Sequence, residues 1–285
     1  MNTEFPKLSL VTPARNEAEN ISLLYESLRN QNDVQILWLI IENDSTDNTW
    51  EIISEFKNTE NLKLIIIQKN FGGEYNVGVK YSKILNFGVN YIKSMESNCR
   101  FPIGICDADC IPNPNYFKSL LAELENNKKL AIVSGRGFNK EGVQDKENIL
   151  HVRGNCRLFS SWYICNNESP IEPSPDSIAI MTAKMQGFDC YSINTSYVCR
   201  EMSAAQSSYE FYGYSAAYRG VSIYFAILKT MRLFLQTPWY ALTYAKGYFK
   251  NKFIVKDKLD NNKLREFIYK SSIKDIINLV KKVKN

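Results

Sequence analysis

The chain has 285 residues, of which 45% are hydrophobic and 23% charged, an ordinary globular composition that provides for one large domain or one domain with an appendage. Its single histidine, His151, argues against a histidine-based catalytic triad and a histidine-rich zinc site. Seven cysteines without a Cys-x-x-Cys pair, and an N-terminus (MNTEFPKL) with neither a basic start nor a long apolar run, predict a cytoplasmic protein with reduced thiols and no signal peptide.

The formal net charge of +5 is unevenly distributed along the chain. Residues 1–200 hold 20 Lys and Arg against 24 Asp and Glu, a net charge of −4, whereas residues 201–285 hold 15 against 6, a net charge of +9. Such a split predicts that the last third contacts either nucleic acid or an anionic membrane.

Apolar runs that predict strands alternate with segments of helical periodicity over residues 7–134. The predicted strands are Lys7–Thr12, Val34–Ile41, Leu62–Ile67, Phe101–Cys106 and Leu130–Ser134. The predicted helices are Ile21–Leu28, Trp50–Phe56, Val79–Ile92 and Pro114–Leu124. This alternation predicts an α/β fold with a mostly parallel sheet and helices on both of its faces.

The periodicity fades between residues 135 and 175, where Gly, Asn, Arg and Ser are frequent. We expect loops here that could build an acceptor site. Asp176 then opens a helical segment that ends before Gly187, and Cys190–Tyr197 is a further predicted strand.

The last third combines aromatic and basic side chains. In Val221–Tyr248, Lys229 and Arg232 interrupt the apolar pattern and Pro238 breaks it, so the segment does not predict a spanning helix. Aromatic residues interleaved with Lys, Arg, Ile and Leu are typical of an amphipathic segment in a membrane interface, and favour lipid over nucleic acid. The alternative is that these helices cover the sheet or form a dimer contact. A final helix is predicted over Leu264–Val280.

Two aspartates follow the fourth predicted strand in the stretch GICDADCIP. Asp107 and Asp109 are therefore expected at the carboxyl edge of the sheet, where ligands bind in open α/β folds. Carboxylates there suit a hard divalent cation whose shell is completed by substrate phosphates, although an acidic turn is the simpler alternative. Cys106 and Cys110 are expected to be small, buried, apolar side chains.

Five segments, in this order, resemble motifs of the family 2 glycosyltransferases. They are VTPARNEAENI, IIENDSTDNTWEII (similar to a D-D-G-S-T-D-N-T segment), LNFG (similar to an A-R-N-x-G helix), CDADCIP (similar to the metal-binding Asp-x-Asp), and CRLF followed by PDSIAIMTAKMQGF (similar to the late segment with the catalytic acid). The resemblance covers residues 8–190. It implies an inverting, nucleotide-sugar-dependent transferase with a Rossmann-like GT-A fold over residues 1–203, followed by a helical, basic, aromatic-rich extension over residues 204–285.

The resemblance also implies roles for single residues. Asp109 would ligate Mn²⁺ or Mg²⁺ directly, and Asp107 would contact the ribose or a metal-bound water. Asp176 would be the general base, with a helix N-cap as the alternative role. The nucleotide would lie against Pro13, Ala14, Arg15 and Glu17, which follow the first strand.

Other candidate residues depart from the family pattern or carry simpler alternatives. Glu42 and Asn43 stand where the family has two aspartates, so Glu42 is a candidate contact to the base or ribose that leaves the base unspecified. Lys69 is a candidate diphosphate contact or a solvated turn residue. Three arginines could bind a phosphate or carboxylate of the acceptor, or form surface salt bridges. They are Arg136, Arg153 and Arg157.

The expected substrates are a nucleoside-diphosphate sugar and a hydroxyl of a glycan or lipid-linked acceptor, in cell-surface glycan synthesis. The enzyme would work in the cytoplasm, with an anionic membrane surface as a candidate partner at the inner face of the cell membrane and no nucleic acid. One alternative is a nucleotide-sugar nucleotidyltransferase, although PARNE is not its glycine-rich phosphate loop. The other is a non-catalytic protein that binds a nucleotide or a nucleic acid.

Overall fold

The computed structural model describes residues 5–72, 78–95, 100–144, 152–200 and 206–284. The chain divides into two compact units, Met1–Ile171 with Pro175–Met202, and Glu172–Ser174 with Ser203–Asn285. Each unit is described by itself. His151 and the proposed boundary between residues 203 and 204 lie outside the described residues.

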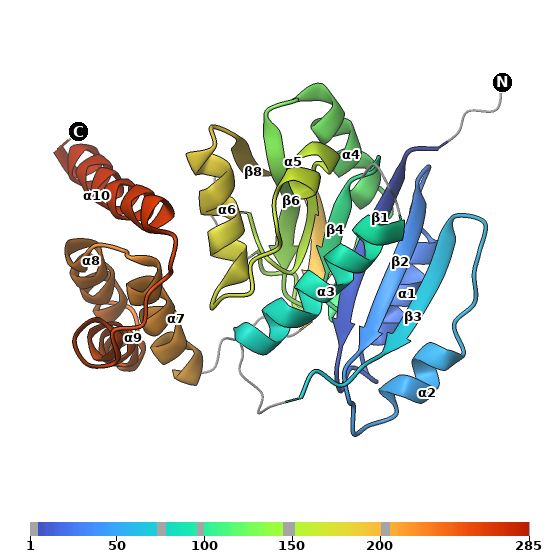
Figure 1. Ribbon diagram of the computed structural model, residues 1–285, viewed down its shortest axis with the longest axis horizontal. Coiled ribbons are helices and arrows are strands. Elements are labelled where there is room, and N and C mark those ends of the chain that lie inside the picture. Colours follow the sequence, from blue (N-terminus) through green and yellow to red (C-terminus); the bar gives the residue numbers. More distant parts are fainter. Residues whose placement is uncertain (1–4, 73–77, 96–99, 145–151, 201–205, 285) are drawn as a thin grey trace. The chain divides into compact units, whose positions relative to one another are not determined.

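The first unit is built on an eight-stranded sheet with the order β3-β2-β1-β4-β7-β6-β8-β5 (Figure 1). The strands are β1 (Lys7–Ala14), β2 (Gln35–Glu42), β3 (Leu62–Gln68), β4 (Ile103–Cys106), β5 (Cys110–Pro112), β6 (Leu130–Phe138), β7 (Cys156–Phe159) and β8 (Asp189–Cys199). Strand β1 pairs in parallel with β2 and β4, β2 with β3, and β6 with β8. Strand β7 runs antiparallel between β4 and β6, and β5 runs antiparallel to β8. The predicted α/β fold with a mostly parallel sheet is confirmed, and the antiparallel strands make the sheet mixed.

Three helices cover each face of the sheet (Figure 1). On one face lie α1 (Ile21–Arg29), α2 (Thr49–Ser54) and α4 (Tyr116–Asn126), and on the other α3 (Val79–Met95), α5 (Ser161–Asn166) and α6 (Pro175–Met185). The coverage of both faces of β2 by helices explains why its sequence is apolar almost without interruption. Trp38 packs toward the first set of helices and Leu39 toward the second, so neither side of the strand faces water.

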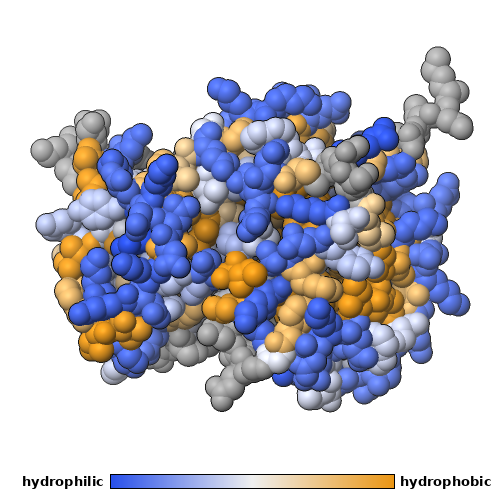
Figure 2. Space-filling view, viewed as in Figure 1, coloured by the Kyte–Doolittle hydropathy of each residue, from blue (hydrophilic) through white to orange (hydrophobic). Residues whose placement is uncertain are grey.

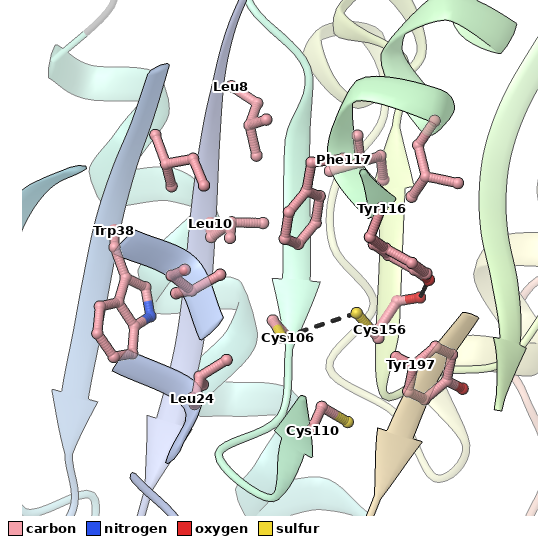
Figure 3. Packing of buried hydrophobic residues seen from close by; sticks show 14 of the residues in the cluster. Leu8, Leu10, Leu24, Trp38, Cys106, Cys110, Tyr116, Phe117, Cys156 and Tyr197 are labelled. Atoms are coloured by element: carbon pink, nitrogen blue, oxygen red, sulfur yellow. Dashed lines mark hydrogen bonds between the residues drawn. The ribbon is translucent and has the colours of Figure 1, made fainter. Parts of the chain in front are cut away.

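The core is anchored where β4 ends, just before the two aspartates. Cys106 and Cys156 are directly opposite each other on β4 and β7, with their Sγ atoms 3.7 Å apart (Figure 3). The Tyr116 hydroxyl donates to the Cys156 carbonyl oxygen at 2.7 Å and accepts from the backbone N–H of Gly135 at 2.8 Å. Cys106 and Cys156 are both buried, and the packing holds the end of β4 in place. Cys110 is buried as well, so the prediction made for Cys106 and Cys110 is confirmed.

The loops expected over residues 135–175 contain regular structure that the sequence pattern missed. Strand β6 continues to Phe138, and β7 and α5 follow. Strand β7 has only four residues, CRLF, which is too short for a strand pattern, and its buried arginine breaks the apolar run. Helix α5 starts at a Ser160 N-cap whose side chain accepts from the backbone N–H of Tyr163.

The second unit consists of helices, namely α7 (Gln206–Arg219), α8 (Ile223–Phe234), α9 (Pro238–Lys250), the π-helical turn η1 (Asn251–Val255) and α10 (Asn262–Lys284). Helices α7 and α9 approach closely because each carries a glycine at the crossing. A Cβ atom on Gly213 would lie 2.0 Å from the Tyr244 carbonyl oxygen, and one on Gly247 would lie 1.9 Å from that of Glu210. Helix α10 includes the predicted helix Leu264–Val280. Among the described residues, no helix is long and apolar enough to cross a membrane.

Candidate active site

A hollow of about 580 Å³ opens at the carboxyl edge of the sheet, where β1 and β4 end. This volume falls in the usual range for ligand pockets. Six of the predicted site residues line it, namely Pro13, Ala14, Arg15, Glu17, Asp107 and Asp109. Asn43, which stands where the family has an aspartate, lines it too, together with five residues that the sequence did not single out, namely Asn16, Lys80, Tyr81, Ile84 and Ala108.

The loop after β1 is held by the loop after β2. Asn16 has a positive φ of 56°, which asparagine tolerates better than most residues. Its side-chain Oδ1 accepts from the backbone N–H of Thr46 at 2.8 Å, and the backbone N–H of Glu17 donates to the Thr49 hydroxyl at 2.7 Å. Asp47 belongs to the same network, because its carboxylate accepts from the backbone N–H groups of Thr49 and Ala18. The network fixes one wall of the hollow.

Glu42 and Asn43 are placed differently from each other. Glu42 is completely buried and does not line the hollow; its Oε1 accepts from the backbone N–H of Ser45 at 2.6 Å. No described residue bonds to its buried Oε2. Asn43 lines the hollow, and its Oδ1 accepts from the backbone N–H of Phe71 at 3.3 Å. Of the two residues, Asn43 therefore lines the hollow and Glu42 does not.

Asp107 is a half-buried carboxylate with a specific partner. The Tyr81 hydroxyl donates to its Oδ1 at 2.7 Å, and its backbone N–H donates to the Asn155 carbonyl at 2.7 Å. Burial raises the pKa of Asp107 well above its usual range. The Tyr81 hydrogen bond acts in the opposite direction on this pKa, and the nearby charges of Asp109 and Asp176 raise it further.

Asp109 lies at the surface of the hollow beside two thiols. The Cys199 Sγ donates to its Oδ2 at 3.0 Å, and Cys110 Sγ lies 3.7 Å from its Oδ1. Cys110 and Cys199 are opposite each other on β5 and β8, and with Asp109 they form the metal-capable group found among the described residues. The carboxylate oxygens of Asp107 and Asp109 fit a hard cation such as Mg²⁺ or Mn²⁺.

Asp176 is the second residue of α6 and forms an ion pair with Arg157 of β7. Its Oδ1 accepts from Arg157 Nη2 at 2.7 Å, with the arginine side chain 2% exposed and the aspartate 37%. The guanidinium carbon lies 4.9 Å from the centre of the Phe159 ring. A Cβ atom on Gly154 would lie 2.0 Å from Asp176 Oδ2, so the absent side chain leaves room for the carboxylate. The nearby charge of Asp176 contributes to the raised pKa values of both Asp107 and Tyr81, so the base candidate and the Asp-x-Asp share one electrostatic environment.

The remaining predicted residues do not line the hollow. Lys69 places its Nζ 4.0 Å from the centre of the Phe87 ring. Arg136 lines a separate hollow of about 670 Å³ together with Asn113 and Asn194. Arg153 lines neither. Arg157 has a short polar contact to Asp176.

Lys80 and Tyr81 are the functional candidates that sequence reasoning missed. Both come from the first turn of α3, and Lys80 is buried although it lines the hollow. The only sequence signal at this place was the helical periodicity of the segment. That periodicity predicts which residues face the core and does not show which helix end reaches the sheet edge.

Comparisons with known proteins agree with this architecture. The model of the family described as "Glycosyl transferase family 2" matches residues 9–195, about two thirds of the chain. The crystal structure of S. aureus TarS 1–349 is similar with a TM-score of 0.55 and 15% identity, over 88% of this chain and 73% of that one. A mannosyltransferase from Pyrobaculum calidifontis, in complex with GDP-Man and Mn²⁺, is similar with a TM-score of 0.57 and 14% identity, over 87% and 76%. TarS 1–349 in complex with UDP-GlcNAc gives 0.53 and 18% identity, over 87% and 73%.

At these identities the solved structures show the shared GT-A fold. No curated protein sequence matches the chain. The family model covers the strands, the loops and the aspartates that form the hollow. The chain therefore belongs to glycosyl transferase family 2 and is a glycosyltransferase.

Proposed function

We propose that the protein is an inverting, metal-dependent glycosyltransferase that moves a sugar from a nucleoside-diphosphate sugar to a hydroxyl of a glycan or lipid-linked acceptor. The observation that carries the proposal is that three carboxylates lie near the end of β4. Asp107 and Asp109 line the hollow, and Asp176 packs against Gly154 and Arg157, which lie on either side of Asn155, whose carbonyl oxygen accepts from the backbone N–H of Asp107. Asp107 is bonded to Tyr81, Asp109 to Cys199 and Asp176 to Arg157. These different surroundings suit the three different roles proposed below.

The donor would occupy the hollow of about 580 Å³. The loop after β1 would lie against the base and ribose, and Arg15 and Lys80 are the basic side chains that line the hollow and could contact the diphosphate. Asn43 offers an amide where many family members have a carboxylate, so the donor base remains open. The related structures hold UDP-GlcNAc or GDP-Man, which makes nucleotides of both kinds the first donors to test.

Asp109 would hold Mn²⁺ or Mg²⁺, because its carboxylate lies at the wall of the hollow. When bound, the ion would neutralise the charge that develops on the departing nucleoside diphosphate. Asp107 is half-buried in the lining of the hollow and its Oδ1 accepts from Tyr81, so its Oδ2 would contact the ribose or a water of the metal shell. The thiols of Cys110 and Cys199 hold the Asp109 side chain from the side of the core.

Asp176 would take the proton from the acceptor hydroxyl as its oxygen attacks the anomeric carbon. Arg157 binds one carboxylate oxygen and leaves Oδ2 for the acceptor. Attack from the face opposite the leaving diphosphate would invert the anomeric centre, as it does in inverting glycosidases. The enzyme would act in the cytoplasm at the inner face of the cell membrane, where a lipid-linked acceptor is accessible.

The test is nucleotide binding with and without Mn²⁺. UDP, GDP and the other nucleoside diphosphates are added to the full-length protein, and thermal unfolding is followed. A ligand at 100 times its Kd stabilises the folded state by about 2.7 kcal/mol. Asp109→Asn should remove the Mn²⁺-dependent part of this shift, whereas Asp33→Asn is the matched control, since Asp33 forms an exposed ion pair with Lys118. Equal Mn²⁺-supported affinity in parent and Asp109→Asn would show that the metal assignment is wrong.

A further inference from the structure

Helix α8 carries apolar side chains on two opposite sides. On its inner side Ala226 is buried, and Leu233 packs against the cluster of the C-terminal unit that contains Tyr244 and Tyr248. On its outer side four large side chains are exposed at helical spacing, namely Tyr224, Ile227, Met231 and Leu235. A surface helix of a globular protein normally presents polar residues on the side away from the core. The outer side of α8 is therefore built to be covered.

The apolar surface continues past the turn into α9. Leu235 is 87% exposed, Trp239 is 72% exposed, and Phe234 and Leu242 are also exposed. Figure 2 shows orange side chains gathered on the part of the surface formed by the C-terminal helices. We call Tyr224, Ile227 and Met231 of α8, together with Leu235 and Trp239 beyond its end, the α8 outer face. Large apolar side chains exposed one after another along a helix and the following turn mark an interaction site more often than scattered single residues do.

The charges around this face indicate what covers it. From Val221 to Lys256 the sequence contains six Lys and Arg residues and no Asp or Glu. Arg232, Lys250, Lys252 and Lys256 are exposed, whereas Lys229 Nζ lies 4.7 Å from the centre of the Tyr244 ring in the inner cluster and Lys246 forms an ion pair with Glu210. A second copy of the chain would bring like charges together across a symmetric contact, which is unfavourable. An anionic lipid surface offers opposite charge to the basic residues and an apolar layer to the outer face.

We propose that the α8 outer face docks on an anionic bilayer and lies in the plane of the headgroup–acyl boundary. Trp239 and Tyr224 combine an apolar ring with a polar atom, the property that places such residues at membrane interfaces. The proposal deepens the location given above and rests on none of the hollow's carboxylates.

The experiment is co-sedimentation of the full-length protein with vesicles. Vesicles of equal parts phosphatidylglycerol and phosphatidylcholine should retain the protein at low salt, and vesicles of phosphatidylcholine alone should retain it less. The variant carrying Leu235→Gln and Trp239→Gln should bind about tenfold more weakly for each substitution, since both side chains leave water on docking. Trp162→Gln is the matched control, because Trp162 is an exposed tryptophan on α5 of the first unit and should leave binding unchanged.

The charge contribution is tested separately. Arg232→Gln with Lys252→Gln should weaken binding to the anionic vesicles and leave the weak binding to neutral ones unchanged. Lys128→Gln with Lys129→Gln neutralises two exposed lysines outside the C-terminal unit and is the control. High salt should weaken vesicle binding without removing it, because it screens only the charge interaction.

Three outcomes would overturn the proposal. The first is full-length protein that stays in the supernatant at low salt, and the second is parent-like vesicle binding by the Leu235→Gln, Trp239→Gln variant. The third is a dimer seen by light scattering that this variant dissociates, without vesicle binding by the parent, which would make a second copy the occupant. Mn²⁺-supported nucleotide binding, measured on the same samples, separates a failure of docking from a failure of the proposed transferase chemistry.

Discussion

The ion pair between Asp176 and Arg157 makes the effect of Asp176→Asn predictable on two separate measurements. Arg157 is 2% exposed, and Asp176 accepts from its Nη2. The other two guanidinium nitrogens, Nε and Nη1, are buried without a partner among the described residues. The substitution preserves the shape of the side chain but removes the negative charge opposite a buried cation. We therefore expect a loss of stability together with a loss of activity.

The size of the stability loss follows from the burial of the two partners. Removing one partner of a fully buried ion pair costs about 3–5 kcal/mol, and a hydrogen bond to a charged group contributes about 1.5–3 kcal/mol. Asp176 is 37% exposed, so water compensates part of the loss, and asparagine can still accept from Arg157. We expect a decrease in the free energy of unfolding of about 2 kcal/mol. For a unit of about 200 residues this lowers the Tm by roughly 4–8 °C.

The loss of a positioned base lowers a rate by about 10²- to 10⁴-fold. Sugar transfer, or hydrolysis of the donor where no acceptor is known, should fall by that factor in Asp176→Asn. Mn²⁺-supported binding of the nucleoside diphosphate should remain, since Asp176 does not line the hollow. Thermal unfolding, nucleotide titration and product formation are measured on the same preparation.

Arg157→Gln and the double variant Asp176→Asn, Arg157→Gln complete a double-mutant cycle for this ion pair. Because the double variant leaves neither charge without its partner, it should be less destabilised than the sum of the single variants. A variant Asp176→Asn with parent-like Tm and parent-like turnover would refute both the ion-pair energetics and the base assignment. A lowered Tm with full turnover would support the stabilising role of the ion pair and show that Asp176 is not the general base.

Further substitutions test neighbouring contacts. Gly154→Ala places a Cβ atom 2.0 Å from Asp176 Oδ2, so turnover should fall at least tenfold while Mn²⁺-supported nucleotide affinity stays unchanged; parent-like turnover would contradict the placement of the base. Tyr81→Phe removes a hydrogen bond of about 0.5–1.5 kcal/mol from Asp107, so calorimetry should show nucleotide affinity reduced by roughly two- to tenfold. Gly213→Ala places a methyl group against the backbone of α9 and should accelerate proteolysis within α7–α9, and protection equal to the parent would show that the helices can separate without cost.

The fold was predictable where burial leaves a strong pattern in the sequence. Strand β2 is covered on both faces, and its sequence QILWLIIE is accordingly apolar almost throughout. The Asp-x-Asp was predictable as well, because a strand that ends in two carboxylates places them at the edge where parallel strands end. Six of the predicted residues do line one hollow.

The partners of these residues were not predictable, because they depend on how distant elements pack. Arg157 pairs with Asp176 only because β7 inserts between β4 and β6 and turns the arginine inward. The four-residue sequence of β7 does not predict a strand. Tyr81 reaches Asp107 from α3, 26 residues earlier in the chain. A pattern of apolar residues describes the core face of an element and carries no information on which polar groups meet at its ends.

The charges of the hollow give a physical reason for a cation in this site. Its lining includes three carboxylates, Glu17, Asp107 and Asp109, against the two basic side chains Arg15 and Lys80. Burial and the neighbouring carboxylates raise the pKa of Asp107 and so favour its neutral form. A nucleoside diphosphate brings further negative charge to the same place, and Coulomb repulsion opposes its entry. A divalent cation on Asp109, as proposed above, would reverse both effects, because it would attract the diphosphate and favour the ionised form of the carboxylate beside it.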